Sequence, residues 1–187
     1  MNIFFTVMGA AIGSFLNVCI LRLPEEGQSI VRPASRCPQC GHSIRWYDNV
    51  PILSYLVLRG ACRDCGGKIS VQYPLIEALT ALFAFLLFRK YGLSWAYLFS
   101  FLFACSLIVV AVIDLRHQII PHVVTLPGIP LFMAAAVLFM GYRFLDVFLG
   151  AMIGAATLYF VAVYYEALTG RVGLGGGDVN LLAMIGA

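Results

Sequence analysis

Residues 93–113 read LSWAYLFSFLFACSLIVVAVI, a run of 21 residues without one charged side chain. A helix needs about 20 such residues, at roughly 1.5 Å each, to cross a hydrocarbon core of roughly 30 Å. This run therefore predicts a membrane-spanning helix. It ends directly before an aspartate, Asp114.

Further uncharged stretches lie on both sides of this run, at residues 3–21, 123–140 and 147–165. A shorter one, residues 78–88, reaches spanning length if it extends back through Glu77 to Val71. The last, residues 179–187, is too short to cross, and we expect it to be the start of a span in a longer, C-terminally truncated chain.

The composition excludes an ordinary water-soluble domain. Hydrophobic residues make up 61% of the chain, charged residues only 11%, and the mean hydropathy is +0.93. The net charge of +3 is modest, and no basic run is interleaved with aromatic residues, so nucleic acid is not expected as a partner. The sequence predicts an all-α polytopic membrane protein, a bundle of about six transmembrane helices of which the last is incomplete.

One region resembles soluble protein. Residues 22–73 carry most of the charge and two Cys-x-x-Cys pairs, within CPQCGH and CRDCGGK, separated by 21 residues. Two such pairs close a tetrahedral zinc site, and four thiolates leave no open position for catalysis. Two disulfides or a redox dithiol are the alternatives. We expect a structural zinc ion bound by four cysteines: Cys37, Cys40, Cys62 and Cys65.

The basic residues predict the orientation. If the N-terminus lies outside, the inner loops hold seven Lys and Arg residues in 22–73 together with Arg116 and Arg171, nine of the twelve in the chain. Loops rich in Lys and Arg stay cytoplasmic. The predicted organisation is a first transmembrane helix (1–21), a cytoplasmic four-cysteine zinc lobe (22–73) and a transmembrane core (74–187).

Two aspartates are candidates for catalysis. Asp114 ends an uncharged run, where the helix dipole disfavours a carboxylate. Asp178 follows the glycine-rich GLGGG and precedes an apolar segment, so helix capping is the alternative role for it. The predicted topology places both at the cytoplasmic face. Two adjacent carboxylates can share a proton, so that one activates water while the other polarises a carbonyl.

The motifs together resemble those of the bacterial type IV prepilin peptidases, the leader peptidase/N-methyltransferases, a Gly-x-Gly-Asp aspartic protease family. The similarity covers the chain in order. It includes GSFLNVCILRLP (13–24), both cysteine pairs, YPLIE (73–77), IDLRHQIIP (113–121), TLP (125–127) and GLGGGDVNLL (173–182). The chain departs from the family pattern at His122, where an acidic residue is frequent, and at Asn180, where lysine is common.

The resemblance implies an endopeptidase of the bacterial inner membrane. It would remove the leader peptide of type IV prepilins, or of type II secretion pseudopilins, at the cytoplasmic face, with Asp114 and Asp178 as the catalytic pair. It also implies N-methylation of the new terminus with S-adenosylmethionine, for which Glu77 and the cysteine lobe are candidate determinants. The resemblance alone supports this methyl donor.

Three other functions fit parts of the sequence. A related Gly-x-Gly-Asp intramembrane protease would cut another substrate. A transporter or proton relay would place its acidic residues near the middle of the membrane rather than at helix ends. In a zinc-stabilised scaffold the two aspartates would be replaceable.

Overall fold

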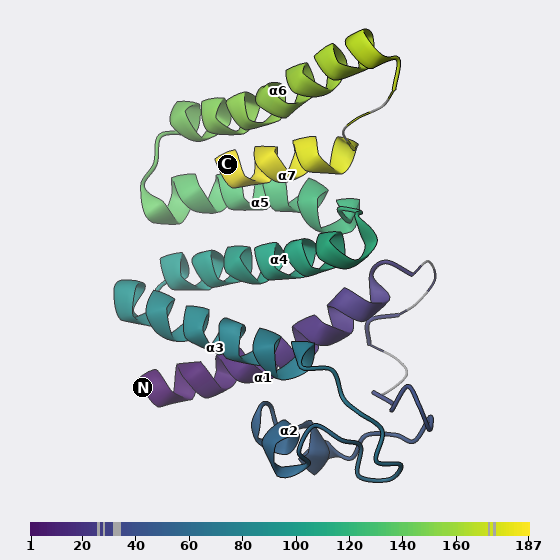
Figure 1. Ribbon diagram of the computed structural model, residues 1–187. Helices are drawn as coiled ribbons and strands as arrows, with labels where there is room; N and C mark the ends of the chain where they lie inside the picture. Colours follow the sequence, from purple (N-terminus) through teal and green to yellow (C-terminus); the bar gives the residue numbers. More distant parts are fainter. Residues whose placement is uncertain (26, 28, 32–34, 172, 174) are drawn as a thin grey trace. The chain divides into compact units, whose positions relative to one another are not determined.

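The computed structural model describes residues 1–25, 27, 29–31, 35–171, 173 and 175–187. These residues form seven α-helices and one short 3-10 helix, with two isolated β-bridges and no strand (Figure 1). The predicted all-α class is confirmed. The helices are α1 (Asn2–Arg22), η1 (Trp46–Asn49), α2 (Leu53–Val57), α3 (Gln72–Tyr91), α4 (Trp95–His117), α5 (His122–Met140), α6 (Phe144–Thr169) and α7 (Gly176–Gly186).

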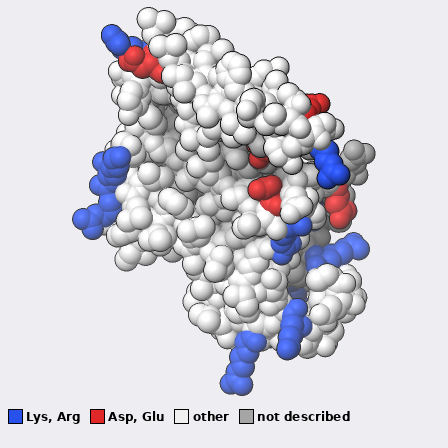
Figure 2. All heavy atoms as spheres, turned by 45° about the horizontal axis from the view of Figure 1, so that its top comes forward, with Lys and Arg blue, Asp and Glu red and all other residues white. Residues whose placement is uncertain are grey.

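Five of these helices are long and apolar enough to cross a membrane: α1, α3, α4, α5 and α6. They coincide with the predicted uncharged stretches. Helix α3 begins at Gln72 and so includes Glu77, as the extended span required. Helix α7 has 11 residues. On the face shown in Figure 2, charged side chains form small separate groups, and broad uncharged areas lie between them.

The chain divides into two compact units. The first contains residues 1–93 with 107–109, and the second contains residues 94–106 with 110–187. Both predicted catalytic aspartates belong to the second unit, whereas the four cysteines and Glu77 belong to the first. The predicted division into a first helix (1–21), a cytoplasmic lobe (22–73) and a transmembrane core (74–187) stays a prediction. The two units are defined by which segments pack together, and they do not separate membrane-spanning from water-soluble parts.

In the first unit, α1 and α3 pack through small residues. A Cβ atom added to Gly9 would lie 2.5 Å from the Ala84 Cβ, and one added to Gly13 would lie 2.7 Å from the Glu77 Cα. Gly9 and Gly13 form a Gly-x-x-x-Gly motif, which lets helix backbones approach closely in a membrane. The rings of Phe5 and Phe88 stack beyond them, with centroids 4.0 Å apart.

In the second unit, the same motif recurs on α6. Cβ atoms on Gly150 and Gly154 would collide with the carbonyl oxygens of Gly186 and Leu182 on α7. On α5, Gly128 has no side chain to obstruct Met184 of α7, which is fully buried. Aromatic rings join α4 to α5, including Phe103 and Phe132, 4.9 Å apart and edge to face. Helix α7 is thus seated between α5 and α6.

We predict that Gly13→Leu destabilises the protein by about 1–3 kcal/mol or more, because the new side chain cannot fit against α3. The matched control is Ala11→Leu on the same helix, since Ala11 is exposed. Thermal unfolding in detergent or vesicles measures both. Equal melting temperatures for the two variants would contradict the close α1–α3 contact.

Candidate active site and metal centre

Asp114 lies in the last turn of α4. The helix ends at His117, and Gln118 adopts a left-handed conformation (φ 53°) from which its N–H donates to the Asp114 carbonyl, 2.8 Å away. The preceding residue, Ile113, is fully buried, whereas Asp114 is exposed. Among the described residues, its carboxylate has no hydrogen-bond or ion-pair partner. It is therefore available to a ligand.

Asp178 is the third residue of α7. Its N–H donates to the Gly175 carbonyl (3.1 Å), and its Oδ2 accepts from the Gly175 N–H (3.2 Å). The second bond is one half of a capping box, in which the third helical residue reaches back to the N–H of the N-cap residue. Asp178 thus helps to cap α7, although Gly175 and not Asp178 occupies the N-cap position. This bond engages one carboxylate oxygen, which fixes the orientation of the group and leaves Oδ1 without a partner among the described residues.

The segments that carry the two aspartates meet. Gly177 lies against Ile120 in the α4–α5 connection, where an added Cβ would be 2.7 Å from the Ile120 Cβ. Three residues after Gly177, the Asn180 amide nitrogen lies 3.2 Å from Nδ1 of His122, the first residue of α5. These contacts join the neighbours of the aspartates and not the carboxylates themselves, so the catalytic pairing stays a prediction.

The glycines around Asp178 have different surroundings. Gly177 is tightly packed against Ile120, while a Cβ on Gly176 would meet no atom within 4 Å. Gly175 has an ordinary φ of −79°. Position 177 therefore requires glycine because a larger side chain would collide with Ile120. At Gly176 the backbone is open, so that a peptide can approach it.

We predict that Gly177→Ala destabilises the protein by about 1–3 kcal/mol, because Ile120 must move. Gly176→Ala should change the stability by no more than about 1 kcal/mol, since its Cβ enters open space. Thermal unfolding compares the two. A stable Gly176→Ala protein that fails to cut a substrate would show that this open backbone is needed for binding, whereas two equally stable variants would contradict the Ile120 contact.

The other acidic residues of the second unit have simpler surroundings. Asp146, in the first turn of α6, forms a two-bonded ion pair with Arg143, with both distances 2.9 Å. Glu166 is exposed near the end of the same helix. Neither lies beside the α7 start in any described contact.

Glu77 is a buried carboxylate in the first unit. Its Oε2 accepts a hydrogen bond of 2.7 Å from the N–H of Ile52, which immediately precedes α2. Ile52 has φ 62° and ψ −50°, and Leu53 N–H donates to the Pro51 carbonyl across it, 2.6 Å away. This is a γ-turn with positive φ, a rare and strained conformation, especially for a β-branched residue. Sequence reasoning missed this contact.

Asn17 forms a polar link between α1 and the start of α3. Its side-chain amide nitrogen donates to the carbonyls of Gly13 and Tyr73, at 3.2 Å each. Asn17 is almost completely buried. Asn17 of the GSFLNV motif thus binds α1 to the end of α3 to which the cysteine lobe is attached.

The four cysteines converge. The sulfur atoms of Cys37, Cys40, Cys62 and Cys65 all lie within 4.8 Å of one another. Those of Cys37 and Cys65 are 3.8 Å apart, which excludes a disulfide between them. All four thiols are free. This arrangement supports the predicted metal site and disagrees with the two-disulfide alternative.

The two cysteine pairs lie in matching turns. In the first, Cys37 N–H donates to the His42 carbonyl and Gly41 N–H to the Cys37 carbonyl. In the second, Cys62 pairs in the same way with Gly67 and Gly66. Gly41 and Gly66 have φ near +70°, which favours glycine. The shared spacing of CPQCGHSI (37–44) and CRDCGGKI (62–69) is the sequence signal of this repeat.

The thiols do not ionise alike. The N–H groups of Cys40 and Gln39 point at the Cys37 sulfur and lower the pKa of that thiol to about 7. The Gly67 N–H acts in the same direction on Cys65, but the neighbouring Cys40 thiol and burial outweigh it and raise the Cys65 pKa to about 12. Several thiolates side by side repel one another, so the four thiols cannot all lose their protons easily. A divalent cation offsets this repulsion and stabilises all four thiolates. The donor set fits zinc.

We predict that the purified protein holds one zinc ion and that Cys37→Ser or Cys62→Ser removes it. Because thiols must lose their protons to bind the metal, zinc should be retained at neutral pH and released on acidification. Elemental analysis measures the content at each pH. Cys105→Ala, a buried cysteine of α4, is the control that should keep its zinc. A zinc-free wild-type protein would contradict the assignment.

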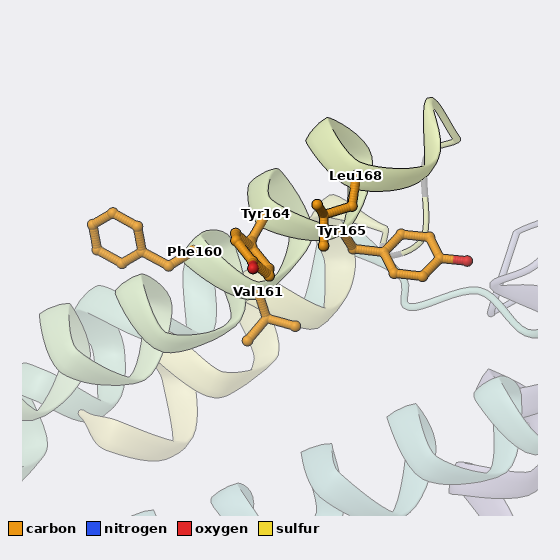
Figure 3. A pocket seen from close by; sticks show the side chains of 5 residues that line it. All are labelled: Phe160, Val161, Tyr164, Tyr165 and Leu168. Atoms are coloured by element: carbon orange, nitrogen blue, oxygen red, sulfur yellow. The ribbon is translucent and has the colours of Figure 1, made fainter.

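A shallow hollow of about 560 Å³ lies on α6 (Figure 3). Of the five spans, α6 is the one least covered by the rest of the protein. The lining has no carboxylate, thiol or imidazole, so the hollow holds none of the predicted catalytic or metal-binding residues. The lining residues are Phe160, Val161, Tyr164, Tyr165 and Leu168.

Two family models match consecutive parts of the chain. Residues 7–91 match the bacterial Peptidase A24 N-terminal domain, and residues 101–187 match the Type IV leader peptidase family. No solved structure matches.

Curated relatives match nearly the whole chain. A protein of Myxococcus xanthus is 43% identical over 185 residues, which cover 99% of this chain and 55% of that protein. Proteins of Pseudomonas putida and Dichelobacter nodosus are each 36% identical, and the matches cover 70% and 74% of their lengths. All three are named prepilin leader peptidase/N-methyltransferase.

Proposed function

The chain belongs to the type IV leader peptidase family, and from this premise we propose that it is a membrane aspartic endopeptidase that removes the leader peptides of type IV prepilins and pseudopilins. The observation that supports this proposal best is the contact between Gly177 and Ile120. It holds the first turn of α7, with Asp178, against the connection that directly follows the Asp114 helix.

The five apolar helices and the family assign the protein to the bacterial inner membrane as a multi-pass protein. We propose that the N-terminus lies outside. Successive spans then put the cysteine lobe, the end of α4 and the start of α7 on the cytoplasmic side. This topology gives both aspartates access to a leader peptide that has not crossed the membrane.

In the proposed mechanism the two carboxylates share one proton. The ionised member takes a proton from water, which attacks the scissile carbonyl, and the protonated member donates a hydrogen bond to the carbonyl oxygen. The proton then passes to the leaving amine. The hydrogen bond from Gly175 fixes the Asp178 carboxylate so that Oδ1 can face the substrate, while the Asp114 carboxylate, which none of the described residues binds, is free to reorient.

We further propose that the new N-terminus is methylated. S-adenosylmethionine would supply the methyl group, and the family supports this activity without assigning any residue of this chain to the donor. The zinc ion itself would serve structure, because four thiolates saturate a tetrahedral ion, while the cysteine lobe around it and Glu77 stay candidate determinants of methyl transfer.

We predict that Asp114→Asn or Asp178→Asn lowers prepilin cleavage by a factor on the order of 10²–10⁴ or more, because a general acid–base group is lost. Membranes that carry the protein are given a prepilin, and mass spectrometry detects the products. Asparagine at position 178 keeps an oxygen for the Gly175 N–H, so the start of α7 should persist.

The control for this prediction is Asp146→Asn, which removes an exposed carboxylate paired with Arg143 and should leave cleavage intact. Zinc content and thermal stability verify that each variant is folded. Cleavage that survives in both aspartate variants would contradict the paired-carboxylate mechanism and favour the scaffold alternative. A mass gain of one methyl group that requires S-adenosylmethionine would establish the second activity.

A further inference from the structure

The short helix α2 presents an apolar face outward. Leu53, Leu56 and Val57 are 61%, 65% and 74% exposed, and their spacing puts them on one side of the helix. The opposite side faces the lobe, where the Ser54 hydroxyl donates to the Tyr47 carbonyl, 3.0 Å away. Grouped exposed apolar side chains of this kind mark a contact surface.

The depth of α2 is fixed by its link to a membrane-spanning helix. The Glu77 carboxylate, which binds the Ile52 N–H, belongs to the sixth residue of α3. Side chains in a helix lean toward its N-terminus, so this carboxylate lies beside the first turn of α3. At that level Val71 and Leu75 are 63% and 61% exposed. The apolar face of α2 is therefore level with the lipid-exposed start of a span.

The flanking residues suit the boundary between lipid and water. Arg59, just after α2, is exposed and has no ion-pair partner among the described residues. A guanidinium at this position matches the phosphate of a lipid headgroup. Trp46, in the 3-10 helix before α2, is 83% exposed, and tryptophan is enriched at membrane interfaces.

We propose that α2 is an interfacial membrane helix. Leu53, Leu56 and Val57 enter the outer edge of the acyl-chain region, Arg59 meets lipid phosphates, and Glu77 holds the helix at this depth through the strained turn at Ile52. The bilayer is the partner of this surface. The proposal is independent of the peptidase activity.

The test uses single-tryptophan proteins. The chain has two tryptophans, Trp46 and Trp95, and both are changed to Phe before one new tryptophan is introduced. Leu56→Trp reports on the apolar face, and Lys68→Trp, at an exposed position of the second cysteine turn, is the matched control. Each protein is placed in phosphatidylcholine/phosphatidylglycerol vesicles whose acyl chains carry bromine, which quenches tryptophan on contact.

We expect the Leu56→Trp protein to lose most of its emission in brominated vesicles and to resist quenching by aqueous acrylamide. The Lys68→Trp protein should show the reverse. Equal behaviour of the two would overturn the proposal. So would Leu56→Trp emission that is shielded only after a prepilin is added, or only at high protein-to-lipid ratio, because the face would then bind a peptide or a second copy.

The role of Glu77 is tested in the same Leu56→Trp background. Glu77→Gln keeps an oxygen acceptor for the Ile52 N–H and should preserve the lipid quenching. Glu77→Leu removes the acceptor and should reduce the quenching and increase acrylamide access. Undiminished lipid quenching in Glu77→Leu, with zinc still bound, would overturn the anchoring role of this carboxylate.

Discussion

Helices inside a bilayer gain little from burying apolar side chains against one another, because lipid is as apolar as leucine. Their association therefore depends on close backbone contact. Both compact units meet this constraint with the same device. Because Gly9 and Gly13 lack side chains, α3 can approach the backbone of α1 closely. Gly150 and Gly154 allow α7 to approach α6 in the same way. The first contact positions the start of α3, to which the cysteine lobe is attached, and the second positions α7, whose first turn contains Asp178.

The polar groups at helix ends divide between structural and chemical roles. Glu77 is buried and satisfies the backbone N–H of a strained turn, and Asp146 is paired with an arginine. Asp178 gives one oxygen to its own helix start. The Asp114 carboxylate forms no hydrogen bond or ion pair with any of the described residues. A carboxylate that the fold does not use is the one most easily explained by function, and it lies at the end of α4, just before the connection that the glycine-rich turn contacts.

Much of this arrangement could be predicted from sequence. The membrane spans can be predicted from hydropathy, because an uncharged apolar run of about 20 residues is typical of a membrane-spanning helix. The convergence of Cys37, Cys40, Cys62 and Cys65 follows from their spacing. The Glu77–Ile52 bond could not be predicted, since isoleucine rarely has positive φ and nothing local signals it. The Gly177–Ile120 contact joins residues 57 positions apart, and a glycine run by itself does not reveal what it touches.

The contact between His122 and Asn180 joins the two positions at which the motifs of this chain depart from those of the family that they resemble. The resemblance leads one to expect an acid and a lysine there, and in this chain the Asn180 amide nitrogen lies 3.2 Å from the His122 Nδ1. An acid at the first position and a lysine at the second would meet the same pairing requirement through an ion pair that the present amide and imidazole meet through their contact. Exchange of position 122 alone to aspartate, or of position 180 alone to lysine, would therefore leave one charge beside a neutral group, whereas the double exchange would restore a matched pair.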